Sequence, residues 1–378
     1  MTEIHGTCKP EFDSVRTAFA ANFDAGIERG ASVSVTLRGE PVVDLWAGDA
    51  DGAGTPWQQD TIVNCWSVTK TMSAIVVLVL ADRGELDLDA PIAAVWPEFG
   101  AGGKGDVTMA HVLGHTSPVP GFSPAIAATD LYDHDLCAAN LAASEAWWPS
   151  GTHAGYHAIT QGYVESEVVR RLTGRTIGQY FRDEIAGPLG ADFHIGLPES
   201  EEPRVGEMVP PGNVLGALEG ADTASMDFRI LASAPVSGEE QNTRAWRAAE
   251  IPSAGGTGNA RSVARVHALI ANGGTLDGVR ILSPEGVERI FTEQWNGPVD
   301  ALGMTMRLGT GFGLMSESTP LSPNPRSCFW GGWGGAICVI DADLELSVAY
   351  VMNKMAGGLV GDLRGAVLAL TAIGAASA

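Results

Sequence analysis

The sequence predicts an α+β protein in which segments near both termini form one antiparallel sheet flanked by helices, an α/β sandwich with a mostly helical lobe inserted. Residues 31–48 and residues 335–353 each alternate like two strands around a turn. The section between them is rich in Pro, Gly and short helical patterns. We therefore expect a discontinuous α/β domain of residues 1–84 and 250–378, a helical insertion of residues 85–249, and an active-site cleft between them.

The elements near the N-terminus follow from local patterns. Apolar residues recur at helical spacing over residues 10–29, which predicts a helix. The next segment, "ASVSVTLRGEPVVDLWAG", predicts a hairpin that turns at Arg38-Gly39-Glu40. The run "NCWSVTKTMSAIVVLVLADRG", residues 64–84, is apolar enough to predict a helix inside the protein.

Later elements are predicted in the same way. An amphipathic helix is expected at about 158–173, ending at Gly174, and another at about 258–272 with a glycine stop. A short hairpin and a helix follow in "TLDGVRILSPEGVERIFTEQ". Strands turning around Asp341-Ala342-Asp343, and a final helix in "GDLRGAVLALTAIG", complete the chain.

Composition excludes several function classes. The 378 residues carry a formal net charge of -22, and only four lysines are present, so no basic patch can neutralise a phosphate backbone or an anionic membrane. We expect no nucleic-acid and no membrane partner. The N-terminus shows no basic segment followed by an apolar one, so the cytoplasm is the expected compartment. Five scattered cysteines favour neither a disulfide framework nor a zinc site.

Ser67 and Lys70 are the first candidates for chemistry. If a helix begins near Ser67, residues i and i+3 lie on one face, and the amine can reach the hydroxyl. The helix N-terminus also offers unpaired N–H groups for an oxyanion. Burial beside the apolar run would have to lower the lysine pKa by ~3 units for it to act as a base. By itself the spacing favours the structural alternative, an N-cap serine and a lysine that reaches solvent.

The S-x-x-K spacing is typical of class A β-lactamases and penicillin-binding proteins. Together with "VTMAHVLGHTSPVPGF", the stretch from Ser67 to Phe99 resembles the first motif of the serine β-lactamase and penicillin-binding superfamily, in its class C β-lactamase-like branch. This resemblance implies a β-lactamase-like fold. It also implies that Tyr156 of "YHA" is the tyrosine of the second motif, Tyr-x-Asn, which shares the proton of the nucleophile.

Two departures point away from β-lactamases. Ala158 stands where the second motif has Asn, and Trp330-Gly331-Gly332 occupies the place of Lys-Thr-Gly, a motif expected on the edge strand beside the nucleophile. Both features are similar to family VIII carboxylesterases. Losing the motif lysine removes a cation for a substrate carboxylate, which favours neutral substrates. Glycines there let a substrate approach, and we expect the backbone N–H groups of Ser67 and Trp333 to form the oxyanion hole.

Other residues are weaker candidates. Phe122, Trp148, His157 and Trp333 lie next to the motifs and are expected to line the substrate cleft. His115 is expected to be structural. The pairs His111/His115 and His153/His157 lack the glutamate of H-E-x-x-H, so no metal site and no cofactor is expected.

The sequence thus predicts a serine carboxylesterase that cleaves small neutral esters through an acyl-enzyme on Ser67, with Lys70 or Tyr156 as general base. An amidase or peptidase acting on anilides, oligoamides or D-amino-acid amides, or an acyltransferase, would use the same site, with weak β-lactamase activity in addition. A non-enzymatic binding protein is disfavoured because Ser67, Lys70 and Tyr156 are all present. Physiological substrate, acyl chain length and homo-oligomerisation are left open.

Overall fold

The computed structural model describes residues 2–212 and 222–378. In this part of the chain, nine strands form one antiparallel sheet in the order β1-β3-β2-β14-β13-β12-β11-β10-β9. Strands from the two ends of the chain meet at its centre, where Val33 of β2 pairs with Tyr350 of β14. The nine strands are β1 (His5–Cys8), β2 (Gly30–Leu37), β3 (Glu40–Gly48), β9 (Trp295–Val299), β10 (Met304–Leu308), β11 (Gly313–Leu314), β12 (Ser327–Gly331), β13 (Ile337–Asp341) and β14 (Leu346–Met352).

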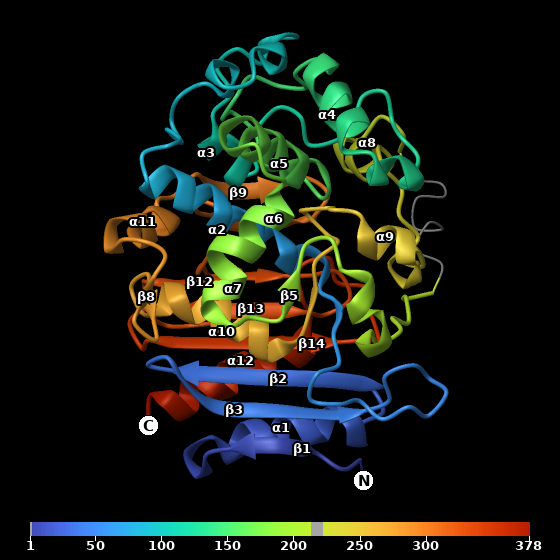
Figure 1. Cartoon of the computed structure of the whole chain (residues 1–378), viewed down its shortest axis with the longest axis vertical. Coiled ribbons are helices and arrows are strands. Elements are labelled where there is room, and N and C mark those ends of the chain that lie inside the picture. Colours follow the sequence, from blue (N-terminus) through green and yellow to red (C-terminus); the bar gives the residue numbers. More distant parts are fainter. Residues whose placement is uncertain (1, 213–221) are drawn as a thin grey trace.

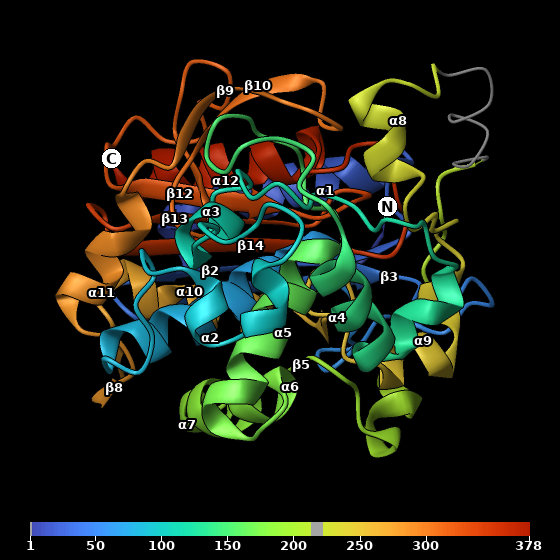
Figure 2. The ribbon, with the colours of Figure 1, turned by 90° about the horizontal axis from the view of Figure 1, so that it is seen from above.

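Helices cover both faces of this sheet (Figure 2). α1 (Asp13–Asp24) and α12 (Leu363–Ala376) pack together on one face, and α10 (Ala260–Ala271) packs on the other. β2, β13 and β14 are therefore buried on both faces, which explains their nearly continuous apolar sequences. The predicted α+β class and the antiparallel sheet built from both termini are confirmed.

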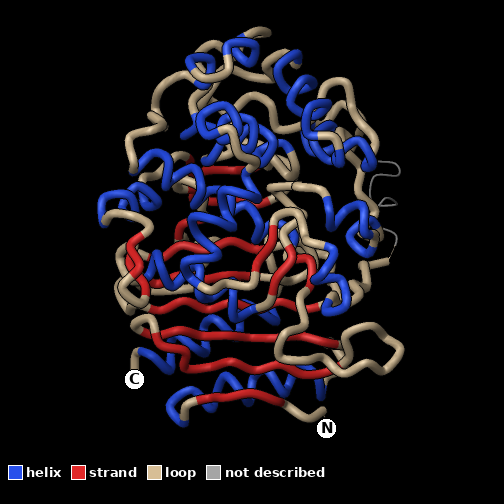
Figure 3. The backbone as a smooth tube through the Cα atoms, viewed as in Figure 1, coloured by secondary structure: helices blue, strands red, loops and turns tan. Residues whose placement is uncertain are grey.

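Helices gather beyond the β9 side of the sheet, as the tube drawing shows (Figure 3). Among the helices of the middle section, α5 packs against α2 (Thr69–Asp82). The helices of the middle section are α3 (Met109–Leu113), α4 (His134–Ala143), α5 (Thr160–Thr173), α6 (Ile177–Phe181), α7 (Gly187–Leu189), α8 (Met226–Leu231) and α9 (Arg244–Ala248). The domain boundaries near residues 84 and 250 stay predictions.

Most predicted elements occur close to their expected bounds. The first hairpin turns at Arg38 and Gly39, which have φ of 52° and 79°. α5 ends at Gly174 in the left-handed conformation, the C-cap that glycine favours. The second predicted hairpin and helix are β7 (Thr275–Leu276), β8 (Val279–Arg280) and α11 (Pro284–Glu288). The helix predicted for residues 10–29 is shorter, and β1 precedes it.

A second, three-stranded sheet lies at the base of α2. It consists of β4 (Val63–Asn64), β6 (Thr257–Gly258) and β5 (Phe193–His194). The backbone N–H of Cys65, just after β4, donates to Gly256 O at 2.8 Å, and the N–H of Gly256 donates to Thr69 Oγ1 at 2.9 Å. These bonds tie the segment around residue 256 to the start of α2.

Candidate active site

Ser67 and Lys70 lie at the junction of a single 3-10 turn, Trp66–Val68, and α2. Lys70 Nζ is 3.2 Å from Ser67 Oγ, the contact that the i, i+3 spacing predicts. Trp66, directly before the serine, has φ of 48°. A left-handed conformation at a bulky residue is strained and is retained where the surroundings fix it, as at functional sites.

The amine of Lys70 is fully enclosed. Only 1% of the residue is exposed, and its Nζ donates to Ala158 O at 2.7 Å and to Ser253 O at 3.0 Å. Burial lowers the pKa of Lys70 to about 7, although the charge of Glu165 opposes this shift. The segments around Ala158, Ser253 and Tyr156 surround the amine, and a pKa near neutrality lets part of the population carry it uncharged at neutral pH.

Tyr156 completes the contacts of the serine hydroxyl. Its phenol OH donates to Ser67 Oγ at 2.6 Å, and its ring lies 4.9 Å from Lys70 Nζ. Burial raises the pKa of Tyr156 above its ordinary value. The backbone N–H of Tyr156 donates to Asp300 O at 3.0 Å, which fixes the tyrosine segment beside the β9–β10 hairpin.

Two buried histidines support this tyrosine from behind. The backbone N–H of His157 donates to His115 Nδ1 at 3.2 Å, and the His115 ring stacks on Trp330 with ring centres 5.3 Å apart. Burial lowers the pKa of both histidines, so both rings are neutral. His115 is thus structural, as predicted. His157 is 0% exposed and does not line the cavity described below, which contradicts its prediction as a cleft residue.

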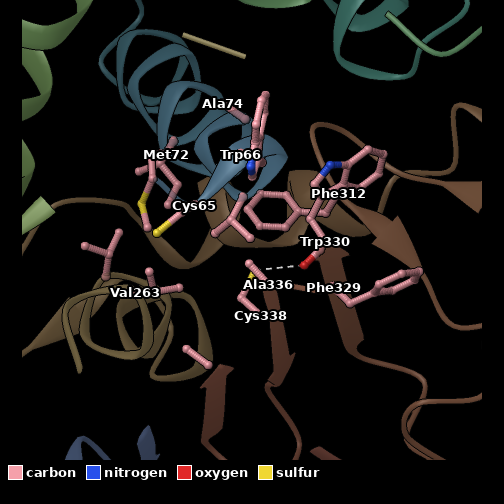
Figure 4. Packing of buried hydrophobic residues seen from close by; sticks show 14 of the residues in the cluster. Cys65, Trp66, Met72, Ala74, Val263, Phe312, Phe329, Trp330, Ala336 and Cys338 are labelled. Atoms are coloured by element: carbon pink, nitrogen blue, oxygen red, sulfur yellow. Dashed lines mark hydrogen bonds between the residues drawn. The ribbon is translucent and has the colours of Figure 1, made fainter. Parts of the chain in front are cut away.

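The third predicted motif lies on β12 and the turn after it. Trp330 and Gly331 end β12, which pairs with β13 on one side and β11 on the other, so this is an inner strand rather than the expected edge strand. The Trp330 side chain is buried within the sheet core (Figure 4). In the same view, Cys338 Sγ lies 3.6 Å from the backbone oxygen of Trp330, to which it donates.

Gly332 brings this turn against the nucleophile. A Cβ placed on Gly332 would lie 3.3 Å from Ser67 N and 2.5 Å from Cys65 O. Within residues 2–212 and 222–378, the backbone N–H groups of Ser67 and Trp333 donate no hydrogen bond. Two unpaired donors on adjoining segments beside a serine hydroxyl are what an oxyanion hole requires.

An apolar cavity of about 390 Å³ opens above the serine. Ser67 and Tyr156 lie at it, and its walls include Trp66, Ile230, Val236, Trp333 and Leu359. Trp66 and Trp333 meet edge to face with centroids 4.7 Å apart. Among the described residues that line this cavity, none is charged.

Two further cleft predictions are wrong. Phe122 and Trp148 are not among the residues that line the cavity, and both side chains are buried. Phe122 packs edge to face on Tyr163. Trp148 donates through Nε1 to Thr116 O at 3.2 Å and packs against His153. Of the four predicted cleft residues, Trp333 lines the cavity.

Sequence reasoning missed several participants. The carbonyl of Ser253, the carboxyl of Glu165 and the wall residues Ile230 and Leu359 come from segments with no motif. For the cavity walls, the one signal in the sequence was that Trp66 stands directly before Ser67. In the described ranges no group of three or more His, Cys, Asp or Glu side chains is arranged to hold a metal ion, and no helix is long and apolar enough to cross a bilayer.

Comparisons with known proteins agree with these features. The profile of the beta-lactamase family matches residues 19–372. The chain is 34% identical over 369 residues to the esterase/beta-lactamase LipL of Mycobacterium tuberculosis, covering 94% of this chain and 84% of LipL. A crystal structure of a family VIII carboxylesterase shares 44% identity and a TM-score of 0.91 over 99% of both chains. A penicillin-binding protein homologue from Caulobacter crescentus shares 35% identity and a TM-score of 0.91, covering 99% of this chain and 100% of the homologue.

Proposed function

Because this chain belongs to the beta-lactamase family, we propose that it is a serine carboxylesterase that cleaves small neutral esters through an acyl-enzyme on Ser67. The resemblance to family VIII carboxylesterases predicted from the motifs is confirmed. The observation that carries the proposal is the hydroxyl of Ser67, which contacts both Lys70 Nζ and Tyr156 OH at an uncharged cavity. LipL is an esterase/beta-lactamase and the 44% identical structure is a family VIII carboxylesterase, which supports the same activity here.

We assign the general base to Lys70. A neutral amine has two N–H bonds and one lone pair. Two carbonyls, Ala158 O and Ser253 O, accept the two N–H bonds, which leaves the lone pair for the Ser67 hydroxyl 3.2 Å away. Tyr156, whose pKa burial raises, stays a phenol and donates to Oγ. The proton therefore passes from Ser67 to Lys70 as Oγ attacks the ester carbonyl.

The remaining steps use the same groups. The N–H groups of Ser67 and Trp333 stabilise the oxyanion of the tetrahedral intermediate. Lys70, now an ammonium, then protonates the leaving alcohol, either directly or by way of the Tyr156 phenol, which passes on its own proton and takes one from Lys70; the amine is neutral again and the acyl group stays on Oγ. A water molecule enters the vacated space, gives a proton to Lys70 and attacks the acyl carbonyl. As the acyl carbon–Oγ bond breaks, Lys70 passes that proton to Ser67 Oγ, which releases the acid and restores the serine hydroxyl and the neutral amine.

The cavity supports a neutral, apolar substrate. No described lining side chain carries a charge that would pair with a substrate carboxylate. Ala158 offers only its carbonyl, already bonded to Lys70, where the Tyr-x-Asn motif has an amide. Both features disfavour β-lactams and peptide termini, which present carboxylates. A small ester molecule is thus the proposed partner, and the cytoplasm is the proposed compartment.

The decisive experiment is hydrolysis of short-chain p-nitrophenyl esters by the wild type and by Ser67→Ala, with fluorophosphonate labelling. We expect the variant to lose turnover and the probe to label Ser67. Ser233→Ala is the matched control, because Ser233 lines the same cavity but donates to Ile230 O at 2.8 Å. Unchanged activity in Ser67→Ala, or labelling at another serine, would refute the proposal.

A substrate panel separates the rival activities. Faster cleavage of anilides or D-amino-acid amides than of matched esters would identify an amidase, an outcome that the penicillin-binding protein homologue makes worth testing. Preferential transfer to an added alcohol or amine would identify an acyltransferase. Nitrocefin should turn over weakly at most. Absence of any labelling would favour a binding protein.

A further inference from the structure

A buried carboxyl group lies on α5, the helix that packs against the nucleophile helix α2. Glu165 is 0% exposed. Gln161 Nε2, one turn earlier, donates to its Oε1 at 2.7 Å. Its other oxygen, Oε2, has no hydrogen-bond partner among the described residues. A carboxyl group in such a place is expensive to ionise unless a positive charge lies near it.

That positive charge is Lys70. Burial raises the pKa of Glu165 to about 7. Interactions with Gln161 and Ser73 and the positive charge of Lys70 each lower that pKa, but by less than burial raises it. Ser253 ties the two helices together at this point: its carbonyl accepts from Lys70 Nζ at 3.0 Å, and its Oγ accepts from the backbone N–H of Gly162 on α5 at 2.7 Å. Glu165 follows Gly162 by three residues, so its carboxyl lies on the face of α5 that approaches Lys70. The interaction is mutual: burial lowers the pKa of Lys70, and the negative charge of Glu165 raises it.

Other titratable groups near the amine are uncharged. His115 and His157 both interact with Lys70, and burial lowers the pKa of each ring. Tyr156 contacts Ser67 as a phenol whose pKa burial raises. Of the described groups that act on Lys70, Glu165 is the one that can balance an ammonium charge.

We infer that Glu165 is a positioning residue whose carboxylate stabilises the ammonium that Lys70 becomes during acylation; this rests on the proposed function. As the Ser67 O–H bond breaks and Oγ bonds to the ester carbon, the proton moves to Lys70 Nζ. The new positive charge then faces the Glu165 carboxylate. When the leaving alcohol takes the proton, the amine is neutral again. Glu165 itself exchanges no atom with the substrate.

The chain offers a variant that separates charge from shape. Glu165→Gln keeps the size of the side chain and its capacity to hydrogen-bond with Gln161, so a purely structural role would survive it. A role that depends on negative charge would not. Glu165 does not line the cavity, so substrate binding should not change.

The test is the pH dependence of ester hydrolysis by the full-length protein. In Glu165→Gln we expect kcat to fall by about tenfold with KM unchanged, because the ammonium formed in the transition state loses its counter-charge. The acid limb of kcat/KM should move to lower pH by about half a unit or more, since an opposite charge raises the pKa of an amine. Glu167→Gln is the matched control.

The control is closely matched. Glu167 lies two residues further along α5, its side chain is only 4% exposed, and it pairs with Arg170 and Arg171 rather than with Lys70. Its replacement should leave the acid limb in place. If Glu165→Gln does not fold, Gln161→Met provides a second test, because losing the Gln161 donor raises the pKa of Glu165 and should move the acid limb in the same direction.

Two outcomes overturn the inference. One is a folded Glu165→Gln protein with wild-type kcat and acid limb. The other is an equal shift of the acid limb in Glu167→Gln. Labelling of wild-type Ser67 by a fluorophosphonate is read in parallel. If Ser67 is not labelled, the proposed function fails; if it is labelled while the profiles coincide, only the role of Glu165 fails.

Discussion

Replacing Gly332 by alanine should disable the enzyme while leaving it folded. Gly332 follows β12 and faces the backbone of the nucleophile turn. A Cβ there would lie 2.5 Å from Cys65 O, 3.2 Å from Trp66 Cβ and 3.3 Å from Ser67 N. Because the closest atom belongs to the backbone, no side-chain rotation can relieve the overlap. The two segments must therefore move apart.

The size of the effect follows from what those segments carry. They hold the two proposed oxyanion donors, the N–H groups of Ser67 and Trp333, and relieving the overlap separates them by roughly 0.5–1 Å. A displacement of about 1 Å at a catalytic group can reduce the rate by about 10²-fold, and losing one oxyanion donor costs about 10²–10³-fold in kcat. Overpacking of this kind destabilises the fold by about 1–3 kcal/mol.

Steady-state hydrolysis of a short-chain p-nitrophenyl ester, with a thermal melt of each variant, measures both effects. Gly357→Ala is the control, since Gly357 lines the same cavity and a Cβ on it would meet no atom within 4 Å. We expect kcat of Gly332→Ala to fall by about 10²-fold and that of Gly357→Ala to stay near wild type. Wild-type kcat in a folded Gly332→Ala protein would refute the assignment of the oxyanion hole.

Three further predictions concern the base, the phenol and the turn that carries Trp333. Because burial lowers the pKa of Lys70 to about 7, its base form is lost as pH falls through about 7, so kcat/KM should decline there; a flat profile from pH 6 to 8 would contradict this. Tyr156→Phe removes the donor 2.6 Å from Ser67 Oγ and should lower kcat by about 10²–10⁴-fold without a change in the melting temperature of more than a few degrees. Arg364 donates to Gly334 O at 2.6 Å and pairs with buried Glu28 at 3.1 Å, so Arg364→Leu should lower the free energy of unfolding by about 3–5 kcal/mol, measured in urea. An unchanged urea midpoint would show that this ion pair does not hold the turn.

Local periodicity predicted the parts of the fold that depend on neighbours in sequence. The Ser67–Lys70 contact is one such part, because two residues three positions apart on a helix lie about one turn apart on the same face. The first hairpin is another, since Arg38-Gly39 can adopt positive φ. β9, β10 and β11 were missed, because these short segments contain Gly, Pro and polar residues and become strands only through pairing within the sheet.

The cavity walls were the least predictable part of the site. Phe122, Trp148 and His157 were chosen because they stand near motifs, yet adjacency in sequence does not say which side of the backbone a side chain takes. The walls come instead from Ile230, Leu359 and other residues that tertiary packing brings over the serine. Tyr156 was placed by resemblance alone, since nothing in the pattern around it indicates a neighbour 89 positions earlier.

The environment of Lys70 shows why a substitution in the second motif is compatible with activity. Two of its acceptors are main-chain carbonyls, Ala158 O and Ser253 O, so the amine keeps these bonds whatever side chain stands at position 158. Both carbonyls can accept from the neutral amine and, more strongly, from the ammonium, and in either state the remaining position on Nζ is directed at Ser67 Oγ. Proton transfer from Ser67 to Lys70 therefore needs no rearrangement of the surrounding dipoles, which is the condition under which a buried polar site lowers a barrier most. Under the proposed mechanism, activation of Ser67 therefore does not require an Asn side chain at position 158.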